Sequence, residues 1–403
     1  MKNRSAAVIF IFITVLIDVI GIGIVIPIVP TLIKELVGGT ISQASSYALW
    51  LVLIYAVMQF LFSPIIGGLS DQYGRRKILL FSLFGFGIDS LFQALAPTIG
   101  WLFLGRTIAG IAGASFTTAN AYIADISTPE KRAQNFGLVG AAFGLGFIIG
   151  PSLGGILGSY SSRLPFFVSA GLSMLNWLYG YFVLPESLPV EKRRKFDFKR
   201  ANPIGSLKHL KKSPFVITLV ASLFLVYIAG YAAQSTWSFY TMEKFHWNEM
   251  EVGLSLGFVG LMIAIVQGGL IRLIIPKIGQ KRALFLGLII NTVGLMAFAF
   301  ASMGWMMYAI MVPFALSGLA NPAFQGIITN HVKDDEQGEL QGALTSVMSL
   351  AAIIGQPIML GLFRVFTSQK TSIYFPGAPF MLGSILTLIS IFITMRVLKG
   401  EEN

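Results

Sequence analysis

Three ionisable residues interrupt long apolar stretches of this sequence, where a charge is costly. Asp18 lies within the first apolar run, and Asp89 and Arg106 lie in two successive runs that meet near Pro97. Ionisable side chains at membrane depth pair with one another or serve proton and substrate pathways. Because the two arms of a helical hairpin bring residues to equal depth, we expect Asp89 and Arg106 to form an ion pair, either functional or purely structural.

Asp18 has no evident partner in the sequence. Burial in an apolar environment favours the protonated form of a carboxyl group, so such a residue can take up and release protons in a functional pH range. We therefore expect Asp18 to be a proton carrier. The alternative is an acid satisfied by polar neighbours.

A second group of charges lies in the segment "GGLSDQYGRRK", residues 67–77. Asp71 ends an apolar run, where the negative end of a helix dipole disfavours an anion, so it needs a cationic partner such as Arg75. Asp125 ends another run on the same side. An arginine between two carboxylates can hold two helices together, and its release lets them move. We call Asp71, Arg75 and Asp125 the gating cluster; the alternative is a basic loop that only sets topology.

Several amides and one phenol have no structural need in lipid. An apolar cavity with a few such groups suits a lipophilic, weakly polar compound. Tyr231 and Gln234 share a helix face with Tyr227, and interhelical hydrogen bonds are the alternative for every member. The candidate substrate-binding residues are Gln59, Asn120, Tyr231, Gln234, Gln267, Asn291 and Gln325.

The segment "GLGFIIGPSLGG", residues 144–155, is rich in small residues. Small residues four apart let a neighbouring helix approach closely, and packing alone accounts for that spacing. Its candidate functional residues are Gly144, Gly150, Pro151, Gly154 and Gly155.

Membrane helices must position all these residues. The chain has 403 residues, of which 55% are hydrophobic and only 12% charged, and its mean hydropathy is +0.76. Many apolar runs are long enough to cross a hydrocarbon core about 30 Å thick. We therefore expect an all-α membrane protein with twelve transmembrane helices, near 6–33, 46–70, 78–96, 99–125, 133–158, 164–184, 214–242, 250–275, 282–302, 304–330, 339–366 and 376–397.

The connections divide the chain into two halves. Basic residues fall in alternate connections, which places that side and both termini in the cytoplasm. A basic linker, 185–213, separates an N-terminal six-helix bundle, 1–184, from a C-terminal one, 214–403. The segment "YGRRKILLFSL", 73–83, matches "IGQKRALFLGL", 278–288. Two pseudo-symmetric bundles are typical of a secondary transporter.

Composition and motifs also exclude several functions. The chain has no cysteine and only three scattered histidines, so neither a disulfide nor a metal site is expected. No phosphate-binding loop is present, which argues against direct ATP drive. The net charge of +11 follows membrane topology, so nucleic acid is not an expected partner. A membrane enzyme is among the least favoured classes, because no cluster of nucleophile, base or metal ligands is visible. A channel is the other, and it predicts leak rather than coupled, saturable flux.

The sequence resembles the tetracycline/proton antiporter group of the major facilitator superfamily. The resemblance covers nearly the whole chain. In addition to 67–77, it is carried by "DVIGIGIVIPIVPTL" (18–32), "IYAVMQFLFSPIIGG" (54–68), "LGRTIAGIAGASFTTANAYIADI" (104–126) and "FGLVGAAFGLGFIIGPSLGG" (136–155).

The resemblance implies roles for several residues. The loop of the gating cluster is a gating element in this superfamily, and acids matching Asp18 and Asp89 are functional in the antiporter group. Residues 144–155 match its antiporter motif, which favours export over import. One departure is Asn291, which replaces an acid, and another is Ile263, which replaces a histidine of some members. Coupling is therefore expected in the N-terminal half, and a metal–tetracycline chelate as substrate is in question.

We accordingly expect a proton-coupled exporter of a small lipophilic compound, with tetracycline the leading candidate. A transporter of another metabolite, including an importer, is the alternative. Protons are the expected coupling ion, without a cofactor. The expected setting is the inner (plasma) membrane of a bacterium, with the lipid bilayer and a small molecule as partners and a monomer as the functional unit.

Overall fold

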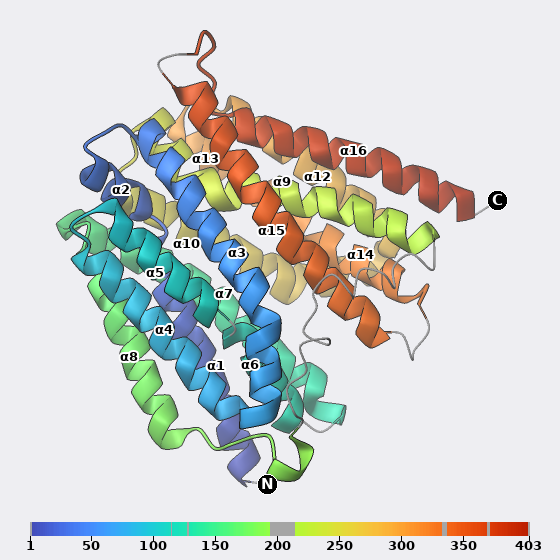
Figure 1. Cartoon of the computed structure of the whole chain (residues 1–403). Coiled ribbons are helices and arrows are strands. Elements are labelled where there is room, and N and C mark those ends of the chain that lie inside the picture. Colours follow the sequence, from blue (N-terminus) through green and yellow to red (C-terminus); the bar gives the residue numbers. More distant parts are fainter. Residues whose placement is uncertain are drawn as a thin grey trace. The chain divides into compact units, whose positions relative to one another are not determined.

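The structure is a computed structural model that describes residues 2–113, 115–126, 129–193, 214–332, 337–368 and 371–401 (Figure 1). The described residues are helical or lie in connections, and they include no strand. The elements are α1 (Lys2–Val25), α2 (Val29–Val37), α3 (Ile41–Tyr73), α4 (Arg75–Leu95), α5 (Ile99–Ala112), α6 (Ser115–Ile126), α7 (Pro129–Tyr160), α8 (Leu164–Val183), η1 (Val190–Lys192), α9 (Pro214–Phe245), α10 (Glu249–Ile265), η3 (Val266–Leu270), α11 (Ile271–Ile278), α12 (Gln280–Phe300), α13 (Gly304–Phe314), η4 (Ala315–Leu319), α14 (Ala320–Thr329), α15 (Gln337–Thr367) and α16 (Ala378–Glu401).

The prediction of an all-α membrane protein is confirmed. Within the described residues, nine helices are long and apolar enough to cross a membrane, and a tenth span results if the bent pair α1–α2 counts as one. The two remaining predicted spans, 99–125 and 250–275, are formed by α5 with α6 and by α10 with η3 and α11.

Four predicted helices are interrupted in the structure, and local chemistry explains two of the breaks. The predicted helix 6–33 bends by 44° between α1 and α2. Pro27 and Pro30 lie at that bend and cannot donate the backbone hydrogen bonds of a continuous helix. The predicted helix 304–330 changes to the 3₁₀ segment η4 just after Pro313. In 250–275 the break is the π-helical segment η3, and in 99–125 α5 ends at Gly113.

The chain folds into two compact units. Unit 1 contains residues 1–39, 50–202 and 247–260, and unit 2 contains 40–49, 203–246 and 261–403. The helices α3 and α10 therefore each contribute residues to both units. Residues 194–213, which hold most of the predicted basic linker, lie outside the described residues.

Each unit has its own packed core. In unit 1, α1 packs against α7 and α8, and α4 packs against α5 and α8. In unit 2, α9 packs against α15 and α16, and α12 packs against α14 and α16. Apolar side chains fill both cores, including Phe10, Leu83 and Tyr122 in unit 1 and Leu223, Leu284 and Phe324 in unit 2.

The internal repeat is visible in backbone geometry. The helices α4 and α12 each contain 21 residues, and a glycine in a left-handed conformation precedes each of them. Gly74 has φ 100° and Gly279 has φ 81°, values that disfavour any residue with a side chain. The two matched sequence segments therefore form the same turn in the two units.

Candidate functional site

The first site lies between α4 and α5 in unit 1. Arg106 donates a hydrogen bond through Nη2 to Oδ2 of Asp89, so the expected ion pair is present. The Asp89 side chain is only 2% exposed, whereas that of Arg106 is 27% exposed. Gly105 makes this arrangement possible, because a Cβ there would lie 2.7 Å from Oδ1 of Asp89. The pair is thus built into the α4–α5 hairpin, and its part in coupling stays a prediction.

A tyrosine on α3 extends this site. The Arg106 guanidinium lies over the ring of Tyr55, 5.8 Å from the ring centroid. Gln59, one turn later, donates from Nε2 to the Tyr55 hydroxyl at 3.3 Å and to the carbonyl oxygen of Gly113 at 3.1 Å. The sequence analysis identified Gln59 but missed Tyr55. The spacing of four residues between two polar groups in an apolar helix is the signal that identifies the pair.

Asp18 lies on α1 and is 5% exposed. It interacts with other groups of the chain, although no partner was evident in the sequence. Its role as a proton carrier stays a prediction. Its charge acts on Tyr55, as do those of Asp89 and Arg106. Four helices of unit 1, α1, α3, α4 and α5, therefore bring these four side chains within electrostatic reach of one another.

The gating cluster is assembled around Arg75, at the start of α4. Its Nη1 lies 2.6 Å from Oδ1 of Asp71 on α3, and its Nε lies 3.2 Å from Oδ2 of Asp125 on α6. Nη1 also donates to the Ser70 hydroxyl at 2.5 Å, and the hydroxyl of Ser187 donates to Asp125 at 3.1 Å. One guanidinium thus links three helices, as the sequence analysis expected, while its role in gating stays a prediction.

A third acid, Glu186, completes this end of unit 1 and was not foreseen. Its Oε1 accepts the backbone N–H of Arg75 at 2.9 Å, which neutralises part of the partial positive charge at the N-terminus of α4. Its carboxylate lies directly against Gly74, where a Cβ would collide with it. Arg193 holds the other carboxylate oxygen at 3.9 Å. The contact could not be foreseen from the sequence, because this residue lies 111 positions away from Arg75.

The small residues of α7 contact two different helices. A Cβ at Gly150 would lie 2.9 Å from Cα of Gly23 on α1, and one at Gly154 would collide with the carbonyl oxygen of Ile24. Gly155 faces α10 instead, where a Cβ would lie 3.0 Å from Cα of Gly253. These glycines allow α1 and α10 to approach α7 from two sides.

Two details of the small-residue segment differ from expectation. A Cβ at Gly144 would have no described atom within 4 Å, so this glycine is not required by packing in this conformation. Gly146, which was not among the candidates, does approach α1 closely, and Gly158, also not a candidate, lies against Ile28 in the bend between α1 and α2. Pro151 is buried, and its ring lies against Gly23. The α1 contact follows the four-residue spacing 146, 150 and 154, whose first member lies outside the candidate list, and 158 continues that spacing onto Ile28.

Several polar side chains of unit 2 lie together on α9, α14 and α15. Tyr227 on α9 donates to Oδ1 of Asn321 at 3.4 Å and is hydrogen-bonded to Gln325 on α14. Tyr231, one turn later, is hydrogen-bonded to Gln356 on α15. Gln356 was not foreseen. These phenols and amides come from three helices; Asn321 is exposed and the others are partly buried. They can present hydrogen-bonding groups to an uncharged ligand.

Other candidates lie elsewhere. Gln234 and Gln267 are exposed, and Gln267 lies in the π-helical segment η3. Asn291 is buried and donates from Nδ2 to the Thr387 hydroxyl on α16 at 3.3 Å. Asn291 therefore makes an interhelical hydrogen bond in this conformation, which is the alternative to a substrate-binding role. Asn120 lies on α6, and its side chain is outside the described part of the structure.

Comparisons with known proteins give a consistent result over the full chain. The sequence profile of the Major Facilitator Superfamily matches residues 11–356 and, in a second match, 274–402. The chain is 37% identical over 389 residues to tetracycline resistance protein, class C, of Escherichia coli, covering 96% of each. It is 34% identical over 404 residues to tetracycline resistance protein, class G, of Vibrio anguillarum, covering 98% of each.

The fold is also similar to that of solved structures. The crystal structure of the human organic anion transporter MFSD10 (TETRAN) superimposes with a TM-score of 0.71 at 22% sequence identity, over 97% of this chain and 99% of that one. At this level of identity the likeness concerns the fold alone.

Proposed function

Since this chain belongs to the Major Facilitator Superfamily, a family of membrane transporters, we propose that it exports a small lipophilic compound in exchange for protons, with tetracycline as the first candidate. Membership of the family confirms the resemblance inferred from sequence and makes the chain a multi-pass transporter rather than an enzyme. The relatives named as tetracycline resistance proteins support efflux of that drug class.

One observation carries the proposal of proton coupling. Asp18 and Asp89 are 5% and 2% exposed, in two helices of unit 1, and Arg106 forms an ion pair with Asp89. A buried carboxyl group that alternates between a protonated and an ionised form can carry a proton, whereas the amides and hydroxyls of unit 2 cannot.

The proposed cycle assigns a separate task to each acid. Asp89 holds Arg106 in place, and Asp18 takes up a proton from the outer side and releases it to the cytoplasm. A difference of one pH unit supplies about 1.4 kcal/mol per proton. A membrane potential of 100 mV adds about 2.3 kcal/mol for each charge that crosses. Together they suffice for export of a neutral solute against a concentration ratio of several hundred.

The gating cluster and the unit 2 face supply the other two functions. Release of Arg75 from Asp71 and Asp125 accompanies the conformational change, because one guanidinium cannot hold α3, α4 and α6 together while they move. Tyr227, Tyr231 and their amide partners contact the substrate. We propose a bacterial plasma-membrane protein with both termini in the cytoplasm, which the basic connections favour, and a monomer that works without a cofactor.

Transport assays in everted membrane vesicles test this function. A panel of lipophilic compounds that includes tetracycline is added, and proton movement is followed with a pH-sensitive dye. An exporter accumulates its substrate inside such vesicles with saturable kinetics and releases protons outward. Movement of the substrate with protons in the same direction would indicate import, and unsaturable movement without proton release would indicate a channel; either result rejects the proposal.

A further inference from the structure

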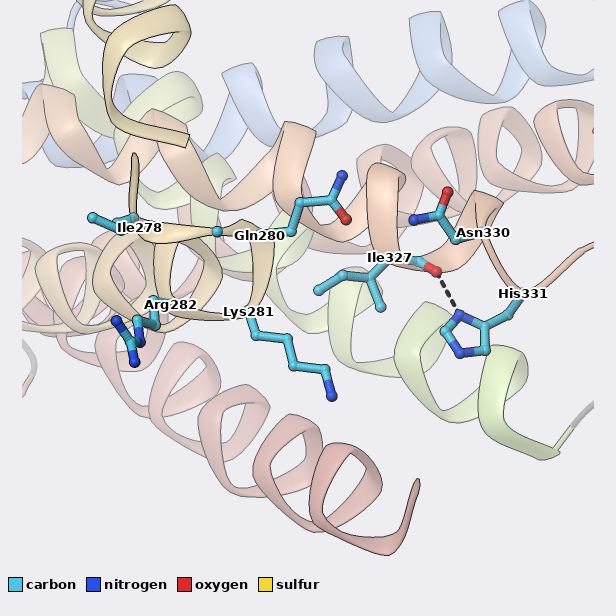
Figure 2. Close-up of a pocket in the computed structure, with 8 residues that line it drawn as sticks. Ile278, Gln280, Lys281, Arg282, Ile327, Asn330 and His331 are labelled. Carbon is cyan, nitrogen blue, oxygen red and sulfur yellow. Dashed lines mark hydrogen bonds between the residues drawn. The ribbon is translucent and has the colours of Figure 1, made fainter. Parts of the chain in front are cut away.

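Buried polar side chains are satisfied differently in the two units. Among the described residues, every buried side-chain nitrogen or oxygen atom that forms no hydrogen bond belongs to unit 1. The polar side chains around the cavity of about 380 Å³ at the start of α12 in unit 2 are exposed, and one of them, His331, bonds to the carbonyl oxygen of Ile327 at 2.7 Å (Figure 2). Solvent satisfies exposed groups, whereas a buried group needs a partner inside the protein.

Four of the unpartnered atoms lie on four different helices of unit 1. They are the hydroxyl oxygens of Thr14 on α1, Ser82 on α4 and Thr118 on α6, and Oδ1 of Asn176 on α8. None of the four residues is more than 1% exposed. A buried polar atom without a partner destabilises the folded state, and ordered internal water is a common partner of such atoms.

The four residues lie in one packed core. Their chain neighbours belong to, or pack against, the same apolar cluster of unit 1, namely Val15, Leu83, Ala119 and Trp177. Two of the four residues are in direct contact, because Nδ2 of Asn176 donates to the carbonyl oxygen of Thr14 at 2.9 Å. Oδ1 of the same amide and the hydroxyl of Thr14 therefore lie at one place between α8 and α1.

Two contacts with α8 place this group beside the proposed proton carrier. The Ser169 hydroxyl donates to the carbonyl oxygen of Gly21 at 2.8 Å, and Asn176 contacts Thr14. Asp18 lies on α1 between Gly21 and Thr14. The unpartnered atoms of Thr14 and Asn176 are therefore about one helical turn from Asp18 along α1.

The contact between α4 and α8 places Ser82 at the same level. These two helices pack against each other in antiparallel directions. The hydroxyl oxygens of Ser90 and Ser169 lie 3.1 Å apart. Ser82 lies about two turns before Ser90, and Asn176 lies about two turns after Ser169, so the two residues have similar depths in the bundle.

We propose that this part of unit 1 binds internal water that relays protons between Asp18 and the gating cluster. The proposal rests on the proposed role of Asp18 as the proton carrier. A water molecule both donates and accepts hydrogen bonds, so it can join hydroxyl and amide oxygens that do not reach one another. Buried water typically makes two to four such bonds, which the oxygens of Thr14, Ser82, Thr118 and Asn176 can supply.

Tyr122 leads from the water site to the cytoplasmic end of unit 1. It lies one turn after Thr118 on α6, is buried, and donates from its hydroxyl to the carbonyl oxygen of Pro185 at 2.8 Å. The charges of Asp125 and Glu186 act on this hydroxyl. The path therefore ends at the acids around Arg75.

Proton release along this path changes the charge of one residue only. The Asp18 carboxyl gives its proton to the bound water, and the water gives one of its own protons to the next oxygen of the path. Each hydroxyl ends with the number of protons with which it began. Asp18 ends as a carboxylate, and the proton reaches solvent water beside the gating cluster.

Isosteric variants of the full-length protein test for the water. Thr14→Val and Thr118→Val each remove one hydroxyl and keep the volume of the side chain. If the hydroxyl binds water, that water loses a hydrogen bond, and we expect the midpoint of thermal unfolding in detergent to fall. If the hydroxyl lies in a dry core, the change removes an unsatisfied polar group. A midpoint that rises or does not move overturns the proposal.

Transport separates a relay from a structural role. We expect Thr14→Val and Thr118→Val to slow proton-driven accumulation in everted vesicles about tenfold relative to counterflow exchange, which needs no net proton movement. Thr14→Ser and Thr118→Ser keep the hydroxyl and should restore the wild-type ratio of the two rates. Thr241→Val in unit 2 should leave the ratio unchanged, because the Thr241 hydroxyl bonds within its own helix, to the carbonyl oxygen of Trp237 at 2.9 Å.

Two transport results overturn the relay. One is an unchanged ratio in both valine variants, and the other is an equal loss of accumulation and counterflow, which indicates a structural defect. Failure of the proposed function has a different signature. Accumulation that survives Asp18→Asn would refute the proton-carrier role, whatever the threonine variants do.

Discussion

The two units use the same turn with opposite chemistry. In unit 1 the turn at Gly74 is surrounded by an arginine and three carboxylates, those of Asp71, Asp125 and Glu186. In unit 2 the matching turn at Gly279 has amides, cations and a cavity. The backbone geometry of the repeat therefore does not require an ion-pair network.

The helix interiors show the same contrast. Unit 1 buries Asp89 against Arg106, while unit 2 joins its helices through neutral groups such as Asn291 with Thr387. The Ser222 hydroxyl of unit 2 likewise lies 2.6 Å from that of Ser390 and 2.7 Å from that of Thr394. Neutral hydrogen bonds hold helices together without the desolvation penalty of a charge. Unit 1 buries charged groups despite this desolvation penalty, which is consistent with proton coupling in that unit.

The largest expected effect is that of Asp18→Asn. The amide keeps the volume and hydrogen bonding of the side chain but cannot carry a proton. We expect this variant to exchange substrate across the membrane and to lose all proton-driven accumulation in everted vesicles, together with substrate-induced proton release. Counterflow exchange at normal expression is the control. Undiminished accumulation would shift the proton-carrier role to Asp89.

Asp89→Asn is expected to have the next largest effect. It leaves the arginine uncompensated in a largely buried site, with an expected loss of up to about 3–5 kcal/mol in the free energy of unfolding. Asp89→Asn/Arg106→Gln is expected to recover much of that stability, though not transport. Thermal unfolding in detergent measures both.

The matched change in unit 2 is Thr387→Val, which removes a neutral hydrogen bond from Asn291. We expect a loss of about 1–3 kcal/mol in the free energy of unfolding, because one buried amide donor loses its partner.

The outcome that would contradict the unit 1 prediction concerns its double variant. If Asp89→Asn/Arg106→Gln is no more stable than Asp89→Asn alone, the two charges do not stabilise each other.

The gating cluster gives a smaller, kinetic effect. Arg75→Ala removes the contacts to Asp71 and Asp125, and we expect transport about tenfold slower with substrate affinity unchanged, because switching rather than binding is impaired. A tenfold change corresponds to about 1.4 kcal/mol in the barrier. Gln280→Ala, at the matched position of unit 2, is expected to transport normally. Equal slowing of both would remove the distinction between the two turns.

Tyr55→Phe has the smallest expected effect. It keeps the ring under Arg106 and removes only the hydroxyl that accepts the hydrogen bond of Gln59, a loss of about 0.5–1.5 kcal/mol. We expect a shift in the pH profile of transport, because that hydroxyl lies within electrostatic reach of both acids. Tyr231→Phe, which loses its bond to Gln356, is the matched variant in unit 2 and should alter substrate affinity without moving the pH profile.

The sequence by itself determined the architecture and much of the chemistry. Apolar runs of membrane length predict helices regardless of how they pack, since the bilayer requires every backbone polar group to be satisfied within its own segment. A charge inside such a run is costly enough to be conspicuous, so Asp18, Asp89 and Arg106 could be recognised without coordinates. The Asp71–Arg75 pair was also accessible, because an anion at the C-terminal end of a helix needs a nearby cation and Arg75 follows just beyond that end.

Only the tertiary structure decided which distant groups meet. Glu186 reaches the N-terminus of α4, Tyr55 lies under Arg106, and Gln356 pairs with Tyr231 because helix packing brings together residues far apart in sequence. Packing direction also decided that Gly146 touches α1 and Gly158 touches Ile28, while Gly144 meets no described atom within 4 Å. Helical periodicity specifies the faces of each helix, but the rotation and depth at which two faces meet follow from all the side chains between them. No local pattern contains that information.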